Sequence, residues 1–323
     1  MTQKIAILGG GYSSEWEISR KSAEVVYQHL DREKYEPYLV MVRKDEWYVL
    51  DGDQKKVLDL NYFGFLKNGK KIRFDIAFNA IHGDPGENGK LQGYMESKGI
   101  FHTSCSQSVS ALTFNKWQCN TVLQKLGFTC AKSILLDEND KVNPKHIVSE
   151  LGLPLFVKPN NAGSSFGVSK VKKITELETA IKTAFSEGSD IIMESFMDGT
   201  EVGCGVFRYK GEVTALTPTE IRSENEFFDY EAKYQGKAQE ITPAEISKKM
   251  IQLIKNISTS VYQKIHARGI IRVDFIIVND IPHIIEINSI PGLTAESIVP
   301  QQVRYDGIKL STFFGMLLEE ASH

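Results

Sequence analysis

The residues best suited to chemistry lie near the C-terminus, on two segments whose alternation is typical of a β-hairpin. Along the first segment Arg272 and Asp274 share one face, and along the second Glu286 and Asn288 share one face. A turn centred on residues 279–280 predicts Asp274 roughly opposite Glu286. Carboxylate and amide oxygens are ligands that Mg²⁺ prefers. The pattern predicts a magnesium site, and it leaves open a solvated sheet face that carries only an ion pair.

A second candidate is the glycine- and serine-rich stretch that follows a predicted strand in the middle of the chain. Its backbone N–H groups and hydroxyls could surround phosphate oxygens, with Lys158 adding positive charge. The alternative is a plain hairpin turn. Gly163, Ser165 and Gly167 also have the spacing of a nucleophile elbow, but an elbow requires a helix after the turn. Residues 168–171 alternate as a strand does, so a serine hydrolase is disfavoured.

Two further residues stand at turns in the N-terminal part. Glu15 lies in the first turn of a predicted helix, where an acid also stabilises the helix terminus. His82 ends a predicted strand and enters a glycine-rich loop, and loops at the carboxyl ends of strands in α/β sheets commonly bind ligands. A helix-terminal charge and an ordinary surface histidine are the alternatives for these two positions.

Residues 64–71 nearly match a phosphate-binding Walker A loop. Lys71 stands where Ser or Thr should be, and the segment has no strong strand before it and no helix after it. We therefore predict no nucleotide site in this segment.

The elements that must position these residues fall into three parts, with boundaries near residues 104 and 193. The first part alternates strands and helices, which predicts a mostly parallel sheet, and the second is a small α+β lobe. The third has antiparallel strands, a long helix and the hairpin. Capping boxes at Ser14/Glu17 and Thr175/Glu178 predict two helix starts. Further predicted strands are residues 5–8, 38–42, 76–81, 134–136, 155–157, 168–172, 191–194, 202–207 and 213–215, and further helices lie near residues 89–98, 114–126 and 243–266.

Composition limits the classes of function. The 323 residues are 41% apolar and 24% charged, which is ordinary for a globular protein. The net charge is −3 with no long run of one sign, so no nucleic-acid partner is expected. The four cysteines are scattered, which favours reduced thiols over disulfides or a zinc site. No stretch approaches membrane-spanning length, so we expect a cytoplasmic protein without a membrane partner.

Taken together and in order, these segments resemble the D-alanine–D-alanine ligases of the ATP-grasp superfamily. The resemblance implies an α/β and α+β fold. A Rossmann-like βα domain (residues 1–104) would bind substrate and precede the two lobes of an ATP-grasp fold (residues 105–193 and 194–323). The segments that carry the resemblance are residues 9–19, 82–93, 158–168, 230–234, 272–275 and 286–294.

The resemblance implies ATP-dependent ligation of two D-alanine molecules for peptidoglycan synthesis. The first carboxylate would attack the γ-phosphate of ATP, and the amine of the second D-alanine would displace phosphate from the acyl phosphate. Two Mg²⁺ ions, for which Mn²⁺ can substitute, would be held by Asp274, Glu286 and Asn288, with Glu286 bridging. Both steps develop negative charge on oxygens, which suits two metals and Arg272 as the group that stabilises the oxyanion.

Roles at the nucleotide and the substrates follow from the same resemblance. Lys116, Lys158 and Lys233 would contact phosphates, and Glu201 would contact the ribose. Glu15 would hold the first ammonium group, and Ser297 would bind the second carboxylate. The other residues implied at the nucleotide are Ser165, Glu194, Phe196 and Met197, with residues 194–197 as the adenine hinge. The other residues implied at the substrates are His82, Ser164, Tyr234 and Gly292.

Two alternatives compete with this interpretation. The first is a ligase of the same fold that makes D-alanyl-D-lactate or D-alanyl-D-serine, although residues 230–234 favour the dipeptide. The second is an inactive ATP-grasp protein that only binds nucleotide, which intact Glu15, Arg272 and Asp274 argue against. The family also implies a homodimer. Three positions around the nucleotide depart from the commonest family pattern, namely Asn115, Ala162 and Phe196.

Overall fold

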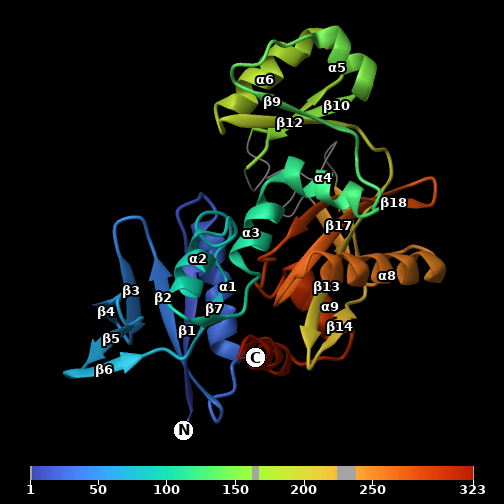
Figure 1. Cartoon of the computed structure of the whole chain (residues 1–323). Helices are drawn as coiled ribbons and strands as arrows, with labels where there is room; N and C mark the ends of the chain where they lie inside the picture. Colours follow the sequence, from blue (N-terminus) through green and yellow to red (C-terminus); the bar gives the residue numbers. More distant parts are fainter. Residues whose placement is uncertain (1, 162–166, 224–237, 323) are drawn as a thin grey trace.

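A six-stranded sheet carries the N-terminal part of the chain (Figure 1). Its strands in spatial order are β4 (Gln54–Val57), β3 (Trp47–Asp51), β2 (Tyr35–Val42), β1 (Gln3–Gly10), β7 (Ile76–Asn79) and β8 (Phe101–His102). In this computed structural model, which describes residues 2–161, 167–223 and 238–322, β2, β1, β7 and β8 are parallel neighbours. The prediction of a mostly parallel sheet is therefore confirmed, with β3 and β4 added as an antiparallel edge.

The two predicted helices of this part are present as α1 (Trp16–His29) and α2 (Lys90–Ser97). The predicted capping box at Ser14 and Glu17 is wrong. The N-cap residue is Glu15, and no side chain caps the helix; the Glu15 N–H instead donates to Ser13 Oγ at 3.3 Å. The turn before α1 is thus held by Ser13, one residue earlier than the box requires.

Residues 64–71, the near match to a Walker A loop, form a two-stranded antiparallel hairpin. Its strands are β5 (Gly64–Lys67) and β6 (Lys70–Arg73). The segment thus has the strand pair and not the helix that a Walker A loop precedes, as its sequence indicated.

The middle lobe is an antiparallel sheet in the order β11 (Ser169–Val171), β10 (Leu155–Pro159), β12 (Asp190–Ser195) and β9 (Ser133–Asp137). With α5 (Pro144–Leu151) and α6 (Leu177–Phe185) it forms the uppermost lobe of Figure 1, as predicted for an α+β unit. The box at Thr175 and Glu178 is wrong. Glu176 accepts the backbone N–H groups of Lys172 (2.8 Å) and Lys173 (3.2 Å), because a 3₁₀ turn precedes α6.

The helix predicted over residues 114–126 is α4 (Lys116–Lys125), and a helix that was not predicted, α3 (Gln107–Phe114), precedes it. Asn115 separates them with extended backbone, and its side-chain oxygen accepts the N–H of Gln118 at 2.9 Å. Asparagine at an N-cap starts a helix in this way. Lys116 is consequently the first residue of α4.

A second six-stranded sheet carries the C-terminal part. Its strands are β16 (Ala238–Ile241), β15 (Thr219–Ser223), β13 (Thr200–Tyr209), β17 (Ile270–Val278) and β18 (Ile281–Asn288), with β14 (Glu212–Ala215) also paired to β13. β15 and β16 were not predicted. The predicted long helix is α8 (Lys248–Lys264), which begins later than residue 243 because Ser247 caps it.

The two faces of this sheet pack against different helices. Val202 and Val273 share a core with Ile254 of α8. On the other face, Phe207 of β13 packs edge-on against Phe313 of α10 (Leu310–Ala321), with ring centroids 5.2 Å apart. α9 (Ile298–Tyr305) lies on this second face too, since Val299 belongs to the same core as Phe207.

The core on the second face continues into the N-terminal sheet. Phe78 of β7 meets Phe314 of α10 with ring centroids 5.7 Å apart, and Ile5 and Ile270 belong to the same cluster. In Figure 1 the C-terminal helix accordingly lies between the two six-stranded sheets. This shared core holds the N-terminal loops against the C-terminal hairpin.

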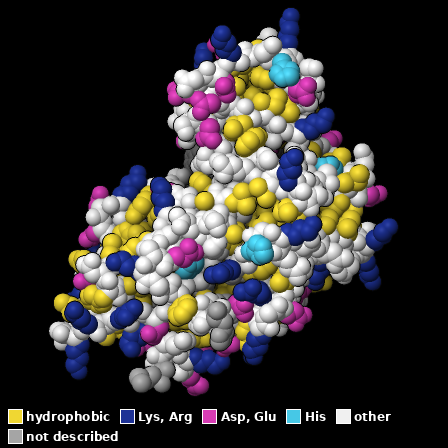
Figure 2. Space-filling model, in the orientation of Figure 1, with side chains coloured by type: hydrophobic (Ala, Val, Ile, Leu, Met, Phe, Trp, Pro, Cys, Tyr) yellow, Lys and Arg dark blue, Asp and Glu magenta, His cyan; other side chains and the backbone are white. Residues whose placement is uncertain are grey.

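The surface in Figure 2 shows acidic and basic side chains interspersed. All four cysteines are free thiols, as predicted. Across the described ranges, the structure contains no helix long and apolar enough to cross a membrane.

Candidate active site

The C-terminal hairpin brings together the four polar residues that its alternation predicted. Asp274 pairs with Glu286 and Arg272 with Asn288 across β17 and β18. Arg272 donates two hydrogen bonds of 2.7 Å to the Asp274 carboxylate, one from Nε and one from a terminal nitrogen. Asn288 Nδ2 donates to Asp274 Oδ2 at 2.8 Å. The predicted pairing of Asp274 with Glu286 is therefore confirmed, and a β-bulge between Asp274 and Phe275 brings it about.

Burial strengthens the charge interactions among these four hairpin residues. Asp274 is 2% exposed, and the side chain of Arg272 is 15% exposed. Burial opposes the guanidinium charge, but Asp274 and Glu286 outweigh burial and raise the pKa of Arg272. Arg272 thus carries a permanent positive charge in a site with little water, where charge interactions are stronger than at the surface.

The donor chemistry of the hairpin fits a hard divalent cation. Within the described ranges, no cluster of three or more His, Cys, Asp or Glu is arranged to hold a metal. Two carboxylates and the side-chain amide of Asn288 do meet on the hairpin, where the amide nitrogen donates to both carboxylates. Carboxylate and amide oxygens are ligands that suit Mg²⁺, which also takes phosphate oxygens and water.

A buried ion pair lies in the middle lobe among the residues implied at the nucleotide. Lys158 Nζ lies 2.5 Å from Glu194 Oε2, and Asn120 Nδ2 donates to Glu194 Oε1 at 2.8 Å. Burial lowers the pKa of Lys158, but the charge of Glu194 outweighs burial, and the pKa is raised overall. The Glu194 carboxylate, expected only at the adenine hinge, is thus also the counter-ion of Lys158.

The other described residues expected at the nucleotide lie on α4, at the end of β12 and on β13. The N–H of Lys116 donates to the carbonyl of Asn160 at 3.2 Å, which places the start of α4 beside the end of β10. Phe196 packs against Phe156, and the Lys170 ammonium lies 4.0 Å from the centroid of its ring. Met197 follows Phe196, and Glu201 lies on β13 opposite Ile276.

His82 connects the N-terminal sheet to the loop after the hairpin. Its Nδ1 lies 2.9 Å from the carbonyl oxygen of Ile290, and its Nε2 lies 3.3 Å from Ser22 Oγ. Ser22 Oγ also accepts the N–H of Leu293 at 3.3 Å. Burial lowers the pKa of His82, so the imidazole is neutral and its Nδ1–H can donate to Ile290. The histidine therefore joins the end of the N-terminal sheet to the loop after β18 and is not an ordinary surface residue.

Glu15 lies close to the same loop. A Cβ atom placed on Gly83 would stand 3.4 Å from Glu15 Oε2 and 2.7 Å from Ser13 Oγ. Gly83 also has φ of +68°, a conformation that favours glycine. Only glycine lets the His82 loop approach the start of α1 this closely.

Ser297 and Gly292 meet at the start of α9. Ser297 is the N-cap residue of that helix, and its hydroxyl lies 2.7 Å from Thr294 Oγ1. A Cβ atom on Gly292 would stand 2.7 Å from Ser297 Oγ. The loop after β18 therefore folds onto the N-terminus of α9.

Glu87 is a titratable residue of this region that the sequence did not single out. Its carboxylate accepts the N–H of Gly83 at 2.7 Å. Burial and the charge of Glu15 raise the pKa of Glu87 to about 8. Its place in the loop of residues 82–89 was visible in the sequence, but its burial beside Glu15 was not.

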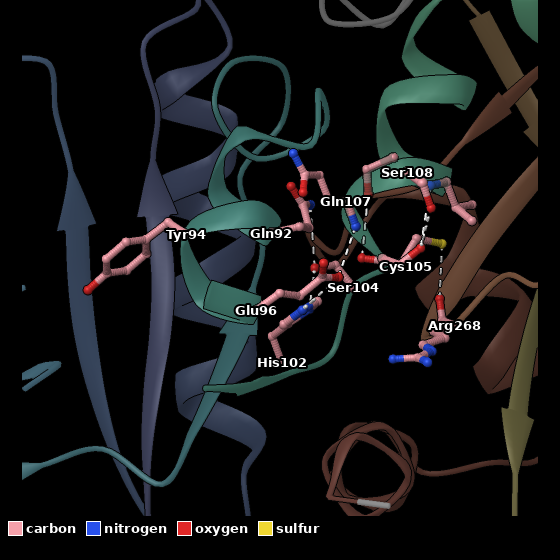
Figure 3. A network of polar contacts seen from close by, with 12 residues as sticks. Gln92, Tyr94, Glu96, His102, Ser104, Cys105, Gln107, Ser108 and Arg268 are labelled. Carbon is pink, nitrogen blue, oxygen red and sulfur yellow. Dashed lines mark hydrogen bonds and ion pairs between the residues drawn. The ribbon is translucent and has the colours of Figure 1, made fainter. Parts of the chain in front are cut away.

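Polar contacts at the junction of α2 and α3 are drawn in Figure 3, and they connect the loop of residues 82–89 to the start of α3. Gln92 Nε2 of α2 donates to the carbonyl of Gly86 at 2.5 Å. Glu96 of the same helix accepts the N–H of Gln107, the first residue of α3, at 2.9 Å. Only Asn115 separates α3 from Lys116, the first residue of α4. These contacts therefore position the loop of residues 82–89 and the start of α4 together.

The structure thus brings the expected residues of three chain segments into one region. The charge of Arg272 contributes to the lowered pKa of His82, and the charge of Glu286 contributes to the raised pKa of both Glu87 and Lys158. Some expected residues lie outside the described ranges: Ala162, Ser164, Ser165, Lys233 and Tyr234.

Comparison with known proteins agrees with this arrangement. Family models described as D-ala D-ala ligase N-terminus and C-terminus match residues 4–105 and 122–319. The chain is 49% identical to a D-alanine--D-alanine ligase of Flavobacterium johnsoniae, covering 98% of each chain, and 50% identical to one of Christiangramia forsetii, covering 99% of each.

Solved structures agree as well. A VanG D-Ala:D-Ser ligase from Enterococcus faecalis is 30% identical with a TM-score of 0.89, covering 99% of this chain and 100% of that one. The D-alanine-D-alanine ligase from Coxiella burnetii is 26% identical with a TM-score of 0.89, covering 99% and 94%. These likenesses confirm the predicted α/β architecture of the ATP-grasp type. With both family models matched and relatives near 50% identity over almost the full length, the chain belongs to the D-alanine–D-alanine ligase family.

Proposed function

We propose that this protein joins two D-alanine molecules in an ATP-dependent reaction and supplies D-alanyl-D-alanine for peptidoglycan synthesis. The observation that carries the proposal is the identity of 49–50% to D-alanine–D-alanine ligases over nearly the whole chain. The buried hairpin group of Arg272, Asp274, Glu286 and Asn288 supports it, because it supplies the charges that the chemistry needs.

The reaction proceeds in two steps. A carboxylate oxygen of the first D-alanine forms a bond to the γ-phosphorus of ATP while the bond to ADP breaks, which leaves an acyl phosphate. The neutral amine of the second D-alanine then attacks the acyl carbon, the C–O bond to phosphate breaks, and the nitrogen loses a proton. Arg272 stabilises the negative charge that develops on oxygen, and Lys116 and Lys158 hold phosphate oxygens.

Asp274, Glu286 and Asn288 are the residues that would hold two Mg²⁺ ions or Mn²⁺ in their place. The cations would neutralise phosphate charge during transfer. The ion pair of Asp274 with Arg272 supports this role, because it holds the carboxylate in a single orientation.

The substrate roles follow the family pattern. Glu15 binds the ammonium group of the first D-alanine, with His82 beside it, and Ser297 with Gly292 binds the carboxylate of the second. Ser164, Tyr234 and Lys233 complete this set as proposals for residues outside the described ranges. At the nucleotide, Glu194, Phe196 and Met197 contact adenine, Glu201 contacts the ribose, and Ser165 contacts phosphate.

Domain division, assembly and location belong to the same proposal. Residues 1–104, 105–193 and 194–323 are taken as three domains, and the family resemblance supports a cytoplasmic homodimer with no nucleic-acid or membrane partner. Sedimentation of the purified protein tests the assembly, and cell fractionation tests the location.

A D-serine acceptor is the second candidate, because a D-Ala:D-Ser ligase is 30% identical with a TM-score of 0.89. The test of both is ADP release with D-alanine alone and with D-alanine plus D-serine, D-lactate or L-alanine, and products identified by mass spectrometry. We expect D-alanine alone to support turnover and to give the dipeptide. Lack of ADP release with D-alanine would overturn the proposed function, and preferential D-alanyl-D-serine would establish the alternative.

A further inference from the structure

Gln302 is a fully buried amide that joins α9 to the central strand of the C-terminal sheet. Its Oε1 accepts the N–H of Gly205 at 2.9 Å, and its Nε2 donates to the carbonyl of Gly203 at 2.8 Å. The same Nε2 lies 3.1 Å from Thr219 Oγ1 on β15. One side chain therefore satisfies two backbone groups of β13 and a hydroxyl of the next strand.

The two glycines of β13 lie directly beside the charged residues of the hairpin. Gly203 pairs with Asp274 and Gly205 with Arg272. A Cβ atom on Gly203 would stand 3.0 Å from Asp274 Oδ1, and one on Gly205 would stand 2.8 Å from Gln302 Oε1. The amide of Gln302 and the two charged side chains thus occupy one face of the sheet, in space that the glycines leave open.

The other end of α9 carries Ser297. The helix is short, Ile298–Tyr305, and the carbonyl of Ser297 accepts the N–H of Gln301 in its first turn. The hydrogen bonds of Gln302, together with the packing of Val299 in the core, hold this short helix on β13 and so set where Ser297 stands relative to Arg272. Ser297 is also packed against Gly292, in the loop that leaves the hairpin.

We propose that Gln302 is a positioning residue for the second substrate. By holding α9 on β13, it sets the distance between the group that binds the second carboxylate and the guanidinium that stabilises the oxyanion. This inference rests on the proposed function, since it assumes an acyl phosphate and an acceptor amino acid.

The test is a competition between two acceptors for the same acyl phosphate. Hydroxylamine has no carboxylate for Ser297 to bind, and it traps the acyl phosphate as a hydroxamate. The ratio of dipeptide to hydroxamate in one mixture does not depend on the amount of active enzyme. Gln302→Met keeps the length of the side chain and removes its hydrogen bonds. We expect the ratio of dipeptide to hydroxamate to fall by about 10-fold to 100-fold, because small misplacements of bound groups lower reaction rates by such factors.

Tyr262→Phe is the matched control. The Tyr262 hydroxyl is buried on the opposite face of the same sheet and donates to the carbonyl of Gly269 at 2.9 Å. This variant also loses a buried hydrogen bond in the same lobe, but we expect its ratio to equal that of the wild type. Thr219→Val, which removes one partner of Gln302, should lower the ratio by about 2-fold to 5-fold and serves if Gln302→Met does not fold.

The outcomes separate the two proposals. Absence of both products with the wild-type protein refutes the proposed function. If the wild-type protein forms both products and Gln302→Met leaves their ratio unchanged, the positioning role alone is refuted. If Gln302→Met does not fold, an unchanged ratio in Thr219→Val refutes it in the same way. An equal fall of the ratio in Tyr262→Phe also refutes it, because loss of any buried hydrogen bond would then suffice.

Discussion

Lys158 and Glu194 form a buried ion pair across the neighbouring strands β10 and β12, with Nζ and Oε2 2.5 Å apart. Their side chains are 16% and 8% exposed, so neither charge is well solvated by water. Both were expected to contact ATP, and the structure adds that each also neutralises the other. Removing one member of such a pair leaves an uncompensated buried charge.

The first prediction concerns this pair. Glu194→Gln should lower the free energy of unfolding by about 3–5 kcal/mol, because the Lys158 ammonium loses its counter-ion in a buried site. Urea unfolding measures the loss. The double variant Lys158→Met/Glu194→Gln should be more stable than the sum of the two single changes implies. Strictly additive losses would show that the ion pair contributes nothing.

The second prediction concerns the hairpin carboxylate Glu286. At saturating Mg²⁺, Glu286→Gln should reduce the rate of ADP release by about 10²–10³-fold, as removal of a group that stabilises charge in a transition state does. The fold should persist, since an amide of the same shape replaces the acid. Asp280→Asn in the turn of the same hairpin is the control and should leave the rate unchanged. Equal rates in both variants would refute the role of Glu286 at the metal.

The third prediction separates two roles of Glu15. Glu15→Gln should raise the KM for the first D-alanine at least 10-fold, because an ammonium ion loses its charged partner. A charge at a helix N-terminus is worth only about 0.3–1 kcal/mol, so the melting temperature should change little. Glu17→Gln, in the first turn of the same helix and exposed, should change stability similarly and leave KM unchanged. If both variants leave KM unchanged, Glu15 only stabilises the helix.

The fourth prediction is a pH dependence from Glu87, whose pKa is raised to about 8 by burial and by Glu15. Between the ordinary carboxyl pKa and this value the folded state binds the extra proton, so its contribution to stability is present at low pH and is lost as pH rises through about 8. Glu87→Gln removes this dependence. We expect the stability of the variant relative to wild type to rise from pH 5 to pH 9 in urea unfolding; a constant difference would contradict the raised pKa.

Local patterns predicted the hairpin correctly for a physical reason. Alternation along a strand has a period of two, so it places Arg272 and Asp274 on one face. The turn pairs Val278 with Ile281, and this register alone would put Asp274 opposite Ile285. A β-bulge between Asp274 and Phe275 shifts the register by one residue and brings Glu286 opposite Asp274. The capping box predicted at Ser14 and Glu17 is wrong because a contact with a distant segment holds the turn before the helix. Ser14 and Glu17 have the right spacing, but Ser13 donates its hydroxyl to the carbonyl of His82, a contact between segments far apart in the chain.

The sequence by itself therefore determined the family and the kind of fold and predicted most residues expected at the site, because collinear motifs and strand alternation are properties of neighbouring positions. Tertiary structure alone decided which charges are paired and which are buried. Three such contacts join elements that are distant in sequence: Glu194 pairs with Lys158, Glu87 lies near Glu15, and Gln302 hydrogen-bonds to β13. Burial and pairing depend on how those elements pack, and no local pattern encodes the packing of distant elements.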